Sequence, residues 1–165
     1  MTNWQNRIVG YGEEAPDQIL ANPMNWRIHS KLQQEALEGV LSEVGWVDDV
    51  IVNQRTGNLI DGHLRVTLAL RKNEPTVPVK YVDLSLEEER LILATFDPIA
   101  AMATADKEIL ENLLREVQSG DTRIQELLAS IAQNNRIDFL SPTEDPGPQI
   151  DRAEELCQKW QTERG

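Results

Sequence analysis

Helical periodicity dominates the chain after residue 30. Between Ser30 and Gly45 apolar residues recur every third or fourth position, with the serine placed to cap a helix and the glycine to end it. The helix at 85–96 begins with a serine–x–x–glutamate capping box, and Asp97-Pro98 is expected to end it. The same spacing predicts three more helices, over 63–72, about 106–118 and about 121–133.

Runs of β-branched residues lie between the first helices. Val50-Ile51-Val52 and Leu59-Ile60 flank a turn at Arg55-Thr56-Gly57, which predicts a β-hairpin. The run VPVKYVDL at 77–84 predicts a further strand. Nearer the N-terminus only Arg7-Ile8-Val9 looks like a short strand, and the residues after it read as turn and loop. These elements indicate a small α+β core followed by helices.

The chain divides into three parts. We expect an α+β domain over 1–98 and a helical C-terminal subdomain over 99–140. From Ser141 the run SPTEDPGPQ carries three prolines in nine residues and reads as a linker. The segment 141–165 is therefore expected to hold this linker and the start of a connector helix to a missing domain.

Composition and charge narrow the class of protein. The chain has 165 residues, of which 40% are hydrophobic and 27% charged, as in soluble globular proteins. It has no apolar run near the roughly 20 residues of a membrane span, no secretory signal pattern and a single cysteine, Cys157. We therefore expect a cytoplasmic protein without a membrane partner. A net charge of −12 without a Lys/Arg cluster argues against strong duplex DNA binding by this chain alone, but is compatible with a small anion in a local site.

Polar residues are concentrated where the hairpin meets the next helix, in the run NLIDGHLRVTLAL. The N–H groups at a helix start point outward and carry the positive end of the helix dipole. Gly62 leaves them open to a phosphate, and Arg65 can add a bidentate fork. Asp61 is a candidate for Mg²⁺ binding or proton transfer, and His63 for acid–base work or phosphate binding. Spacing alone leaves an alternative equally open, namely a tight polar turn with Asp61 as helix cap.

Other polar and aromatic residues are weaker candidates. Trp26, Arg27 and His29 lie in a loop that could enclose a nucleotide, although such a loop more often buries the tryptophan and exposes the arginine. The acidic run Glu87-Glu88-Glu89 suits a helix start through the dipole and needs no function. Asp97 is expected to serve the helix break rather than a site. No His/Cys spacing typical of zinc and no Walker-type phosphate loop occurs in the sequence.

The order of these features is familiar. The loop NPMNWR, a helix ending in E-x-G, the run VNQRTGNLIDGHLR and the run VPVKYVDL follow one another along the chain. In this order they resemble the ParB N-terminal domain, also called the ParB-like nuclease domain, of the ParB/sulfiredoxin superfamily. The resemblance covers about residues 18–97. It implies a small mixed sheet packed with helices and a phosphate site at the helix after D-G-H-x-R.

Members of this superfamily use the same corner for different chemistry. Partition proteins bind and hydrolyse CTP, sulfiredoxin repairs sulfinates with ATP, one branch phosphorylates serine with ADP, and nuclease activity is claimed for others. Carried over, the resemblance assigns Gly62, His63, Arg65 and Arg27 to phosphate or nucleotide binding. It makes Asp61 and His63 catalytic candidates and Asp61 a candidate Mg²⁺ ligand. The implied cofactor is a nucleoside di- or triphosphate with Mg²⁺.

The chain departs from each branch at one point. Sulfiredoxin has a cysteine where this chain has His63, which argues against repair chemistry. Partition proteins carry G-E-R-R at 62–65 and continue into a helix-turn-helix domain, of which 100–140 shows no clear sign. The serine kinases share D-G-H-x-R but take a second carboxylate from the loop before the first helix, where NPMNWRIH has no acid.

The C-terminal segment adds a second resemblance. The run PQIDRAEELCQKWQTERG resembles the joint that links a ParB-like domain to a methyltransferase domain in phage and prophage DNA-modification methylases. No methyltransferase motif occurs in the sequence, so we expect the N-terminal fragment of a longer methylase.

Three functional hypotheses follow. The leading one is a nucleotide- or phosphate-binding domain that serves as the regulatory or accessory module of a DNA-modification methyltransferase. The second is an enzyme in its own right, either a Mg²⁺-dependent nuclease or a nucleotide-dependent phosphotransferase. The third is a non-catalytic interaction module. The expected partners are a nucleotide, DNA reached through a missing C-terminal domain, and a second copy of the chain in a homodimer.

Overall fold

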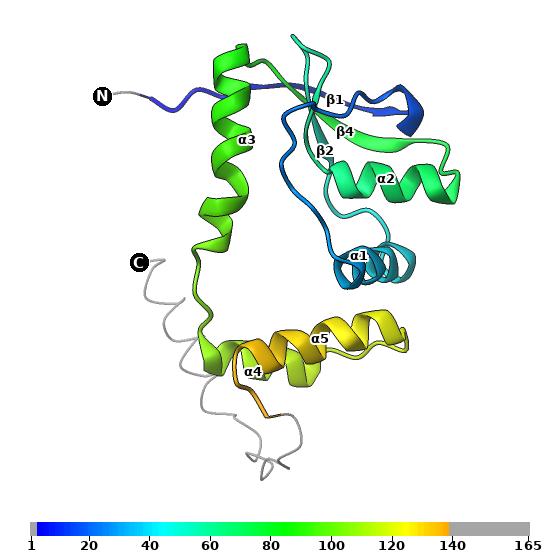
Figure 1. The fold of residues 1–165 in the computed structure, drawn as a ribbon, viewed down its shortest axis with the longest axis vertical. Coiled ribbons are helices and arrows are strands. Elements are labelled where there is room, and N and C mark those ends of the chain that lie inside the picture. The colour runs from blue at the N-terminus through cyan, green and yellow to red at the C-terminus, as the bar shows by residue number, and fades with distance from the viewer. Residues whose placement is uncertain (1–2, 139–165) are drawn as a thin grey trace, which may run out of the picture.

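The computed structural model describes residues 3–138, so the expected linker, connector helix and Cys157 lie outside the described residues. The strands are β1 (Ile8–Glu14), β2 (Val50–Asn53), β3 (Leu59–Asp61) and β4 (Val77–Val82). The helices are the 3₁₀ helix η1 (Pro16–Gln18) and the α-helices α1 (Lys31–Glu43), α2 (His63–Lys72), α3 (Leu86–Ala101), α4 (Lys107–Glu116) and α5 (Thr122–Asn134) (Figure 1). This mixture confirms the predicted α+β fold class.

The strands form one mixed sheet in the order β1-β4-β2-β3. β2 and β3 pair antiparallel as the predicted hairpin, whereas β2 and β4 pair parallel, with Val50 opposite Val79. A parallel pair needs a crossover connection, and α2 supplies it between β3 and β4. The start of α2 therefore lies directly at the end of β3, where the sequence carries its run of polar residues.

The central strands send alternate side chains into two hydrophobic clusters. The first packs against α2 and consists of Val50, Val52, Leu59, Val66, Ala69, Val77 and Val79. The second consists of Ile60, Val82 and Leu84, with Ile51 and Ile92 of α3 packed against it. Consecutive residues of β3 thus point to opposite faces of the sheet, as the two-residue period of a strand requires. The hairpin is thereby fixed between two helices, and so is the corner that follows it.

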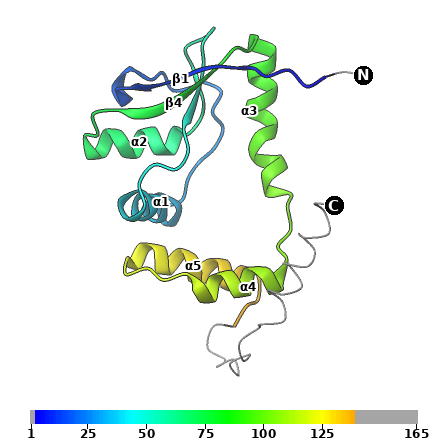
Figure 2. The ribbon, with the colours of Figure 1, turned by 180° about the vertical axis from the view of Figure 1, so that it is seen from behind.

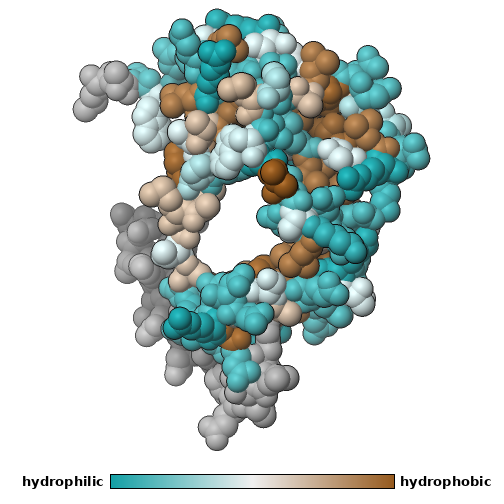
Figure 3. Space-filling model, in the orientation of Figure 1, coloured by the Kyte–Doolittle hydropathy of each residue, from teal (hydrophilic) through white to brown (hydrophobic). Residues whose placement is uncertain are grey.

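The helical part of the chain packs back onto the α+β core. α4 and α5 share a small cluster formed by Leu114, Ala132 and Ile137. Figures 1 and 2 show α5 beside α1 from both sides. Gly39 makes this contact close, because a Cβ atom built there would lie 3.1 Å from Cγ1 of Ile124. Figure 3 shows an opening through the molecule, with α3 on one side and α1 and α5 on the other.

Two sequence-based expectations about the elements were wrong. α3 does not end at Asp97-Pro98 but continues to Ala101. Pro98 stands in the last turn, where a missing N–H costs one hydrogen bond and leaves the preceding turns intact. The N-terminal strand is also longer than expected and runs to Glu14. It is an edge strand with mostly exposed side chains, so hydrophobic alternation cannot reveal it.

The other helix limits agree well with the sequence pattern. α2 spans the predicted range, and Ser30 and Ser85 form the capping boxes of α1 and α3. Gly45, after the end of α1, has the left-handed conformation expected of a helix stop (φ 94°). Within residues 3–138 no helix is long and apolar enough to cross a membrane.

Candidate nucleotide-binding corner

Gly62 forms the corner between β3 and α2. It is the N-cap residue of α2 and has a left-handed backbone with φ 94°. A Cβ atom at this position would lie 2.6 Å from Cγ1 of Val50, inside the sheet. The expectation was that glycine keeps a phosphate's path open. The structure gives a different reason, because both the backbone and the packing on Val50 require glycine whatever binds there.

The start of α2 has no side-chain cap. The four other α-helices of the described chain are each capped by the side chain of their N-cap residue, namely Ser30, Ser85, Asp106 and Asp121. The sequence alternative in which Asp61 caps this helix is wrong, because Asp61 ends β3 and Gly62 takes the cap position. The first N–H groups of α2, which carry the positive end of the helix dipole, therefore have no side-chain cap.

A cavity of about 160 Å³ lies at this helix start. Its lining consists of Arg27, His29, Leu37, Asp61, Gly62, His63, Leu64 and Arg65. All five residues that the sequence and the resemblance singled out are among them. The fold brings Arg27 from the loop before α1 to the D-G-H-x-R run, although the two are far apart along the chain. A cavity of this size has room for a phosphate group or a short phosphate chain.

Asp61 bridges two guanidinium groups. Its Oδ1 lies 3.3 Å from Nη1 of Arg27, and its Oδ2 lies 2.8 Å from Nη2 of Arg65. Both arginine side chains are largely buried, with 17% and 15% of their surface exposed. Arg27 also donates from Nη2 to the carbonyl of Ile60 at 3.3 Å. The carboxylate therefore holds both cations at the cavity wall.

Two further carboxylates complete the ionic network. Arg27 pairs with Asp97 of α3. Arg65 pairs with Asp48 at 3.2 Å. In the sequence Asp97 indicated only a helix break and Asp48 carried no signal, because only the folded chain brings these two carboxylates to the arginines. With three carboxylates on two guanidinium groups, an incoming anion must displace a carboxylate or arrive with its own cation.

His63 lies in the cavity wall as a neutral side chain. Burial lowers its pKa to about 4, and the nearby Arg27 acts in the same direction, whereas Asp61 opposes them. The backbone N–H of Asn22 donates to Nε2 at 3.3 Å. Nδ1 is buried and has no hydrogen-bond partner within residues 3–138. At neutral pH His63 thus brings no charge to a ligand, but it can offer a hydrogen-bonding atom.

The described chain shows no preformed metal site. Within residues 3–138, no group of three or more His, Cys, Asp or Glu residues is arranged to hold a metal ion. Both oxygens of Asp61 are engaged by guanidinium groups. Mg²⁺ in nucleotide sites usually takes only one or two carboxylates plus phosphate oxygens. The residues present therefore fit a Mg²⁺ ion carried in by a phosphate better than a resident ion.

Trp26 differs from the expectation for its loop. Its indole N–H donates to the carbonyl of Leu93 at 3.0 Å, but 57% of the residue stays exposed. The loop is thus attached to α3 by the tryptophan, while its arginine is the more deeply buried residue. Trp26 does not line the cavity, whereas Arg27 and His29 do.

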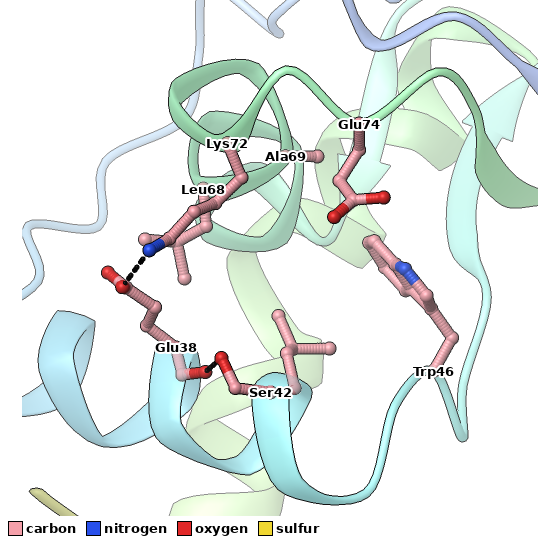
Figure 4. Close-up of a pocket in the computed structure, with 8 residues that line it drawn as sticks. Glu38, Ser42, Trp46, Leu68, Ala69, Lys72 and Glu74 are labelled. Carbon is pink, nitrogen blue, oxygen red and sulfur yellow. Dashed lines mark hydrogen bonds and ion pairs between the residues drawn. The ribbon is translucent and has the colours of Figure 1, made fainter.

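A second cavity, of about 140 Å³, lies between α1 and α2 (Figure 4). Its lining consists of Glu38, Leu41, Ser42, Trp46, Leu68, Ala69, Lys72 and Glu74. Lys72 pairs with Glu38 at 2.5 Å, and this contact lowers the pKa of Glu38. Because its lysine is neutralised and no residue of the corner reaches it, this cavity is the weaker candidate for an anion.

The comparisons with solved structures agree with the resemblance. The C-terminally truncated chromosome-partitioning protein ParB from Caulobacter crescentus, complexed with CTP-γ-S, matches with a TM-score of 0.50 and 22% identity over 79% of this chain and 73% of that one. Two structures of a pNOB8-like ParB N-domain match with TM-scores of 0.48 and 0.46, at 18% and 20% identity. They cover 80% and 82% of this chain, which spans about half of theirs (53% and 49%).

No protein-family model matches the sequence, and no curated protein matches it either. The comparison with the ParB structure from Caulobacter crescentus therefore carries the assignment of the fold. The described chain has the fold of a ParB N-terminal domain.

Proposed function

We propose that this domain binds a nucleotide through its phosphate groups at the cavity around Gly62, His63 and Arg65. The observation that carries the proposal is the convergence of two largely buried arginine side chains on an α-helix start without a side-chain cap. Guanidinium forks and helix N-termini both bind phosphates in proteins.

The charge balance of the corner favours a nucleotide that binds with Mg²⁺. Asp48, Asp61 and Asp97 already outnumber the two arginines, so a bare triphosphate would meet an excess of negative charge. A divalent cation bound to the phosphates removes this excess and offers Asp61 a new partner. In such a complex Asp61 would be the residue that holds the cation, and Arg27 and Arg65 would be available to bind the phosphate oxygens.

The choice of base is guided by the fold. Since the ParB of Caulobacter crescentus was solved with CTP-γ-S, CTP is the first nucleotide to test. Sequence identity of 22% supports a common fold but leaves the base to experiment.

The geometry favours binding over catalysis by His63 or Asp61. A general base needs an available lone pair near neutral pH, but Nε2 of His63 already accepts a hydrogen bond from Asn22. Both carboxylate oxygens of Asp61 are already engaged by guanidinium groups, so neither is free to take a proton from a substrate. We therefore give Asp61 and His63 binding roles.

We further propose that the domain is the regulatory or accessory module of a cytoplasmic DNA-modification methyltransferase. This proposal rests on the resemblance of the C-terminal segment to methylase joints. It is supported by the net charge of −12, since an acidic module leaves the contact with DNA phosphates to another domain.

Thermal unfolding tests nucleotide binding. CTP, ATP, ADP and GTP are added with and without Mg²⁺ to the wild type, to Arg65→Ala and to Arg55→Ala. Arg55 is the matched control, because it pairs with Asp83 away from the cavity. A ligand at about 100 times its Kd stabilises the fold by about 2.7 kcal/mol, which raises the unfolding temperature by about 5–11 °C at this size. We expect such a shift in the wild type and Arg55→Ala, and its loss in Arg65→Ala. No shift with any nucleotide contradicts the proposal.

A further inference from the structure

Glu89 is a buried carboxylate beside the candidate site. It lies in the first turns of α3, and only 1% of the residue is exposed. Four uncharged donors surround its carboxylate: Asn53 at 2.6 Å, Thr56 at 2.6 Å, Asn22 at 2.8 Å and Asn58 at 3.2 Å. Burial raises the pKa of Glu89, but these hydrogen bonds outweigh burial and leave the pKa below its ordinary value. The carboxylate is therefore ionised at neutral pH.

The Glu89 carboxylate joins segments that are distant along the chain. Asn53 ends β2, and Thr56 and Asn58 belong to the hairpin turn, so three of the donors fix the hairpin to α3. Asn22 is different, because it belongs to the loop that also carries Arg27. A buried charge among neutral donors is an expensive way to stabilise a fold, which points to a role in placing these donors.

Asn22 connects Glu89 to the cavity. Its side-chain amide donates to Glu89, while its backbone N–H donates to Nε2 of His63 at 3.3 Å. In a neutral imidazole only one nitrogen carries hydrogen, so an Nε2 that accepts requires the proton on Nδ1. Nδ1 is buried without a partner within the described chain. His63 lines the cavity, and its Nδ1–H is a hydrogen-bond donor that has no partner within residues 3–138.

We infer that Glu89 is a positioning residue that acts through Asn22 and keeps His63 in the tautomer whose Nδ1–H donates to an oxygen of the bound phosphate. The inference rests on the proposed nucleotide binding for the identity of the acceptor. The presence of the proton on Nδ1 of His63 is inferred from the ligand-free geometry alone.

The tautomer is measured by long-range ¹H–¹⁵N NMR on the ligand-free, ¹⁵N-labelled protein at pH 7. The chain has only two histidines, and His29→Gln assigns the signals of the other one. We expect protonated Nδ1 and unprotonated Nε2 in wild-type His63. In Asn22→Ala and Glu89→Gln we expect a mixture of both tautomers.

Thr56→Val is the matched control. It removes a hydrogen bond of 2.6 Å to the same carboxylate but leaves Asn22 in place, so it should keep the wild-type tautomer. A wild-type His63 protonated on Nε2 would overturn the inference. So would wild-type signals in folded Asn22→Ala and Glu89→Gln. If Glu89→Gln does not fold, Asn22→Ala decides alone, because it leaves the carboxylate with three donors.

Titration with CTP and Mg²⁺ separates this inference from the proposed function. We expect Asn22→Ala to bind about tenfold more weakly than the wild type, the loss associated with one hydrogen bond to a charged group. Wild-type affinity in a variant whose tautomer has changed would overturn the link between His63 and phosphate. No binding by the wild type would contradict nucleotide binding, whatever the tautomer experiment shows.

Discussion

At the residue scale, Gly62 is the position where the corner tolerates least change. Alanine there must adopt φ 94° and place its Cβ 2.6 Å from Val50. Gly45 offers a matched comparison, because it has the same φ but nothing within 4 Å of a Cβ. We expect Gly45→Ala to cost about 1–2 kcal/mol of unfolding free energy, and Gly62→Ala about 1–3 kcal/mol more from overpacking. Urea denaturation of both variants measures the difference, and equal losses would contradict the packing argument.

The residues of the candidate site that could be predicted from the sequence are mainly those that lie close together along the chain. Asp61, Gly62, His63 and Arg65 lie within five positions, and the switch from strand to helix period marks their corner. Arg27 was only a weaker candidate from its loop, and the resemblance then assigned it to the site. The roles of Asp48, Asp97 and Glu89 were missed. A carboxylate that pairs with an arginine or asparagine distant along the chain looks the same in the sequence as a carboxylate exposed to water.

At the element scale, the start of α3 gives a prediction for acid stability. A hydrogen bond from Arg7, followed by one from the backbone of Ser85, lowers the pKa of Glu88 to about 2 from its ordinary value of 4.5. Because the pKa is lower in the folded state, Glu88 stabilises the fold above about pH 4.5, and this contribution is lost as the pH falls toward 2. We expect Glu88→Gln to be less stable than the wild type at pH 7 and to approach it at low pH.

Urea midpoints between pH 7 and pH 2 check this prediction. Glu87→Gln is the control, because it removes the same charge from an exposed residue in the same turn. The stability of this variant should differ little from that of the wild type at any pH. If Glu88→Gln lowers the urea midpoint by the same amount at every pH between 7 and 2, the lost stability is unrelated to ionisation and the prediction is wrong.

Element types were more predictable than element ends. Helical spacing and caps predicted α1 and α2 almost to the residue, because their signals are local. Only the start of β1 was predicted, because an exposed edge strand need not alternate apolar and polar residues. α3 passed Pro98 because one lost hydrogen bond in a last turn weighs less than the ion pair of Asp97 with Arg27 and the packing of the helix.

At the scale of the whole molecule, α5 is attached to the core through the Gly39 contact. An ideal Cβ there lies 3.1 Å from Ile124 and 3.2 Å from Oδ2 of Asp121. We expect Gly39→Leu to separate α5 from α1, with faster amide exchange in α5 and unchanged protection in β2 and β4. Gly39→Ala is the milder companion and should show a small effect. Unchanged exchange in the leucine variant would contradict this packing.

The division into a core and a helical subdomain remains a proposal for the whole chain. The sequence separates them by the kinds of element that it predicts, but α5 lies on α1, and the ion pair of Arg27 with Asp97 connects the loop of the site to α3. A change in the contacts of Arg27 at the cavity can therefore affect α3 directly through its ion pair with Asp97. Sequence patterns could not foresee this connection, since it depends on how the elements pack.

The central claim, that the corner at the start of α2 binds a nucleotide through its phosphates, is tested most directly by ¹H–¹⁵N correlation spectra during a titration with CTP and Mg²⁺. Our account predicts that the amide signals of Gly62, His63, Leu64 and Arg65 shift first and most, together with the side-chain signal of Arg27. Spectra that stay unchanged, or shifts that gather instead around Trp46 and Lys72 at the second cavity, would contradict it.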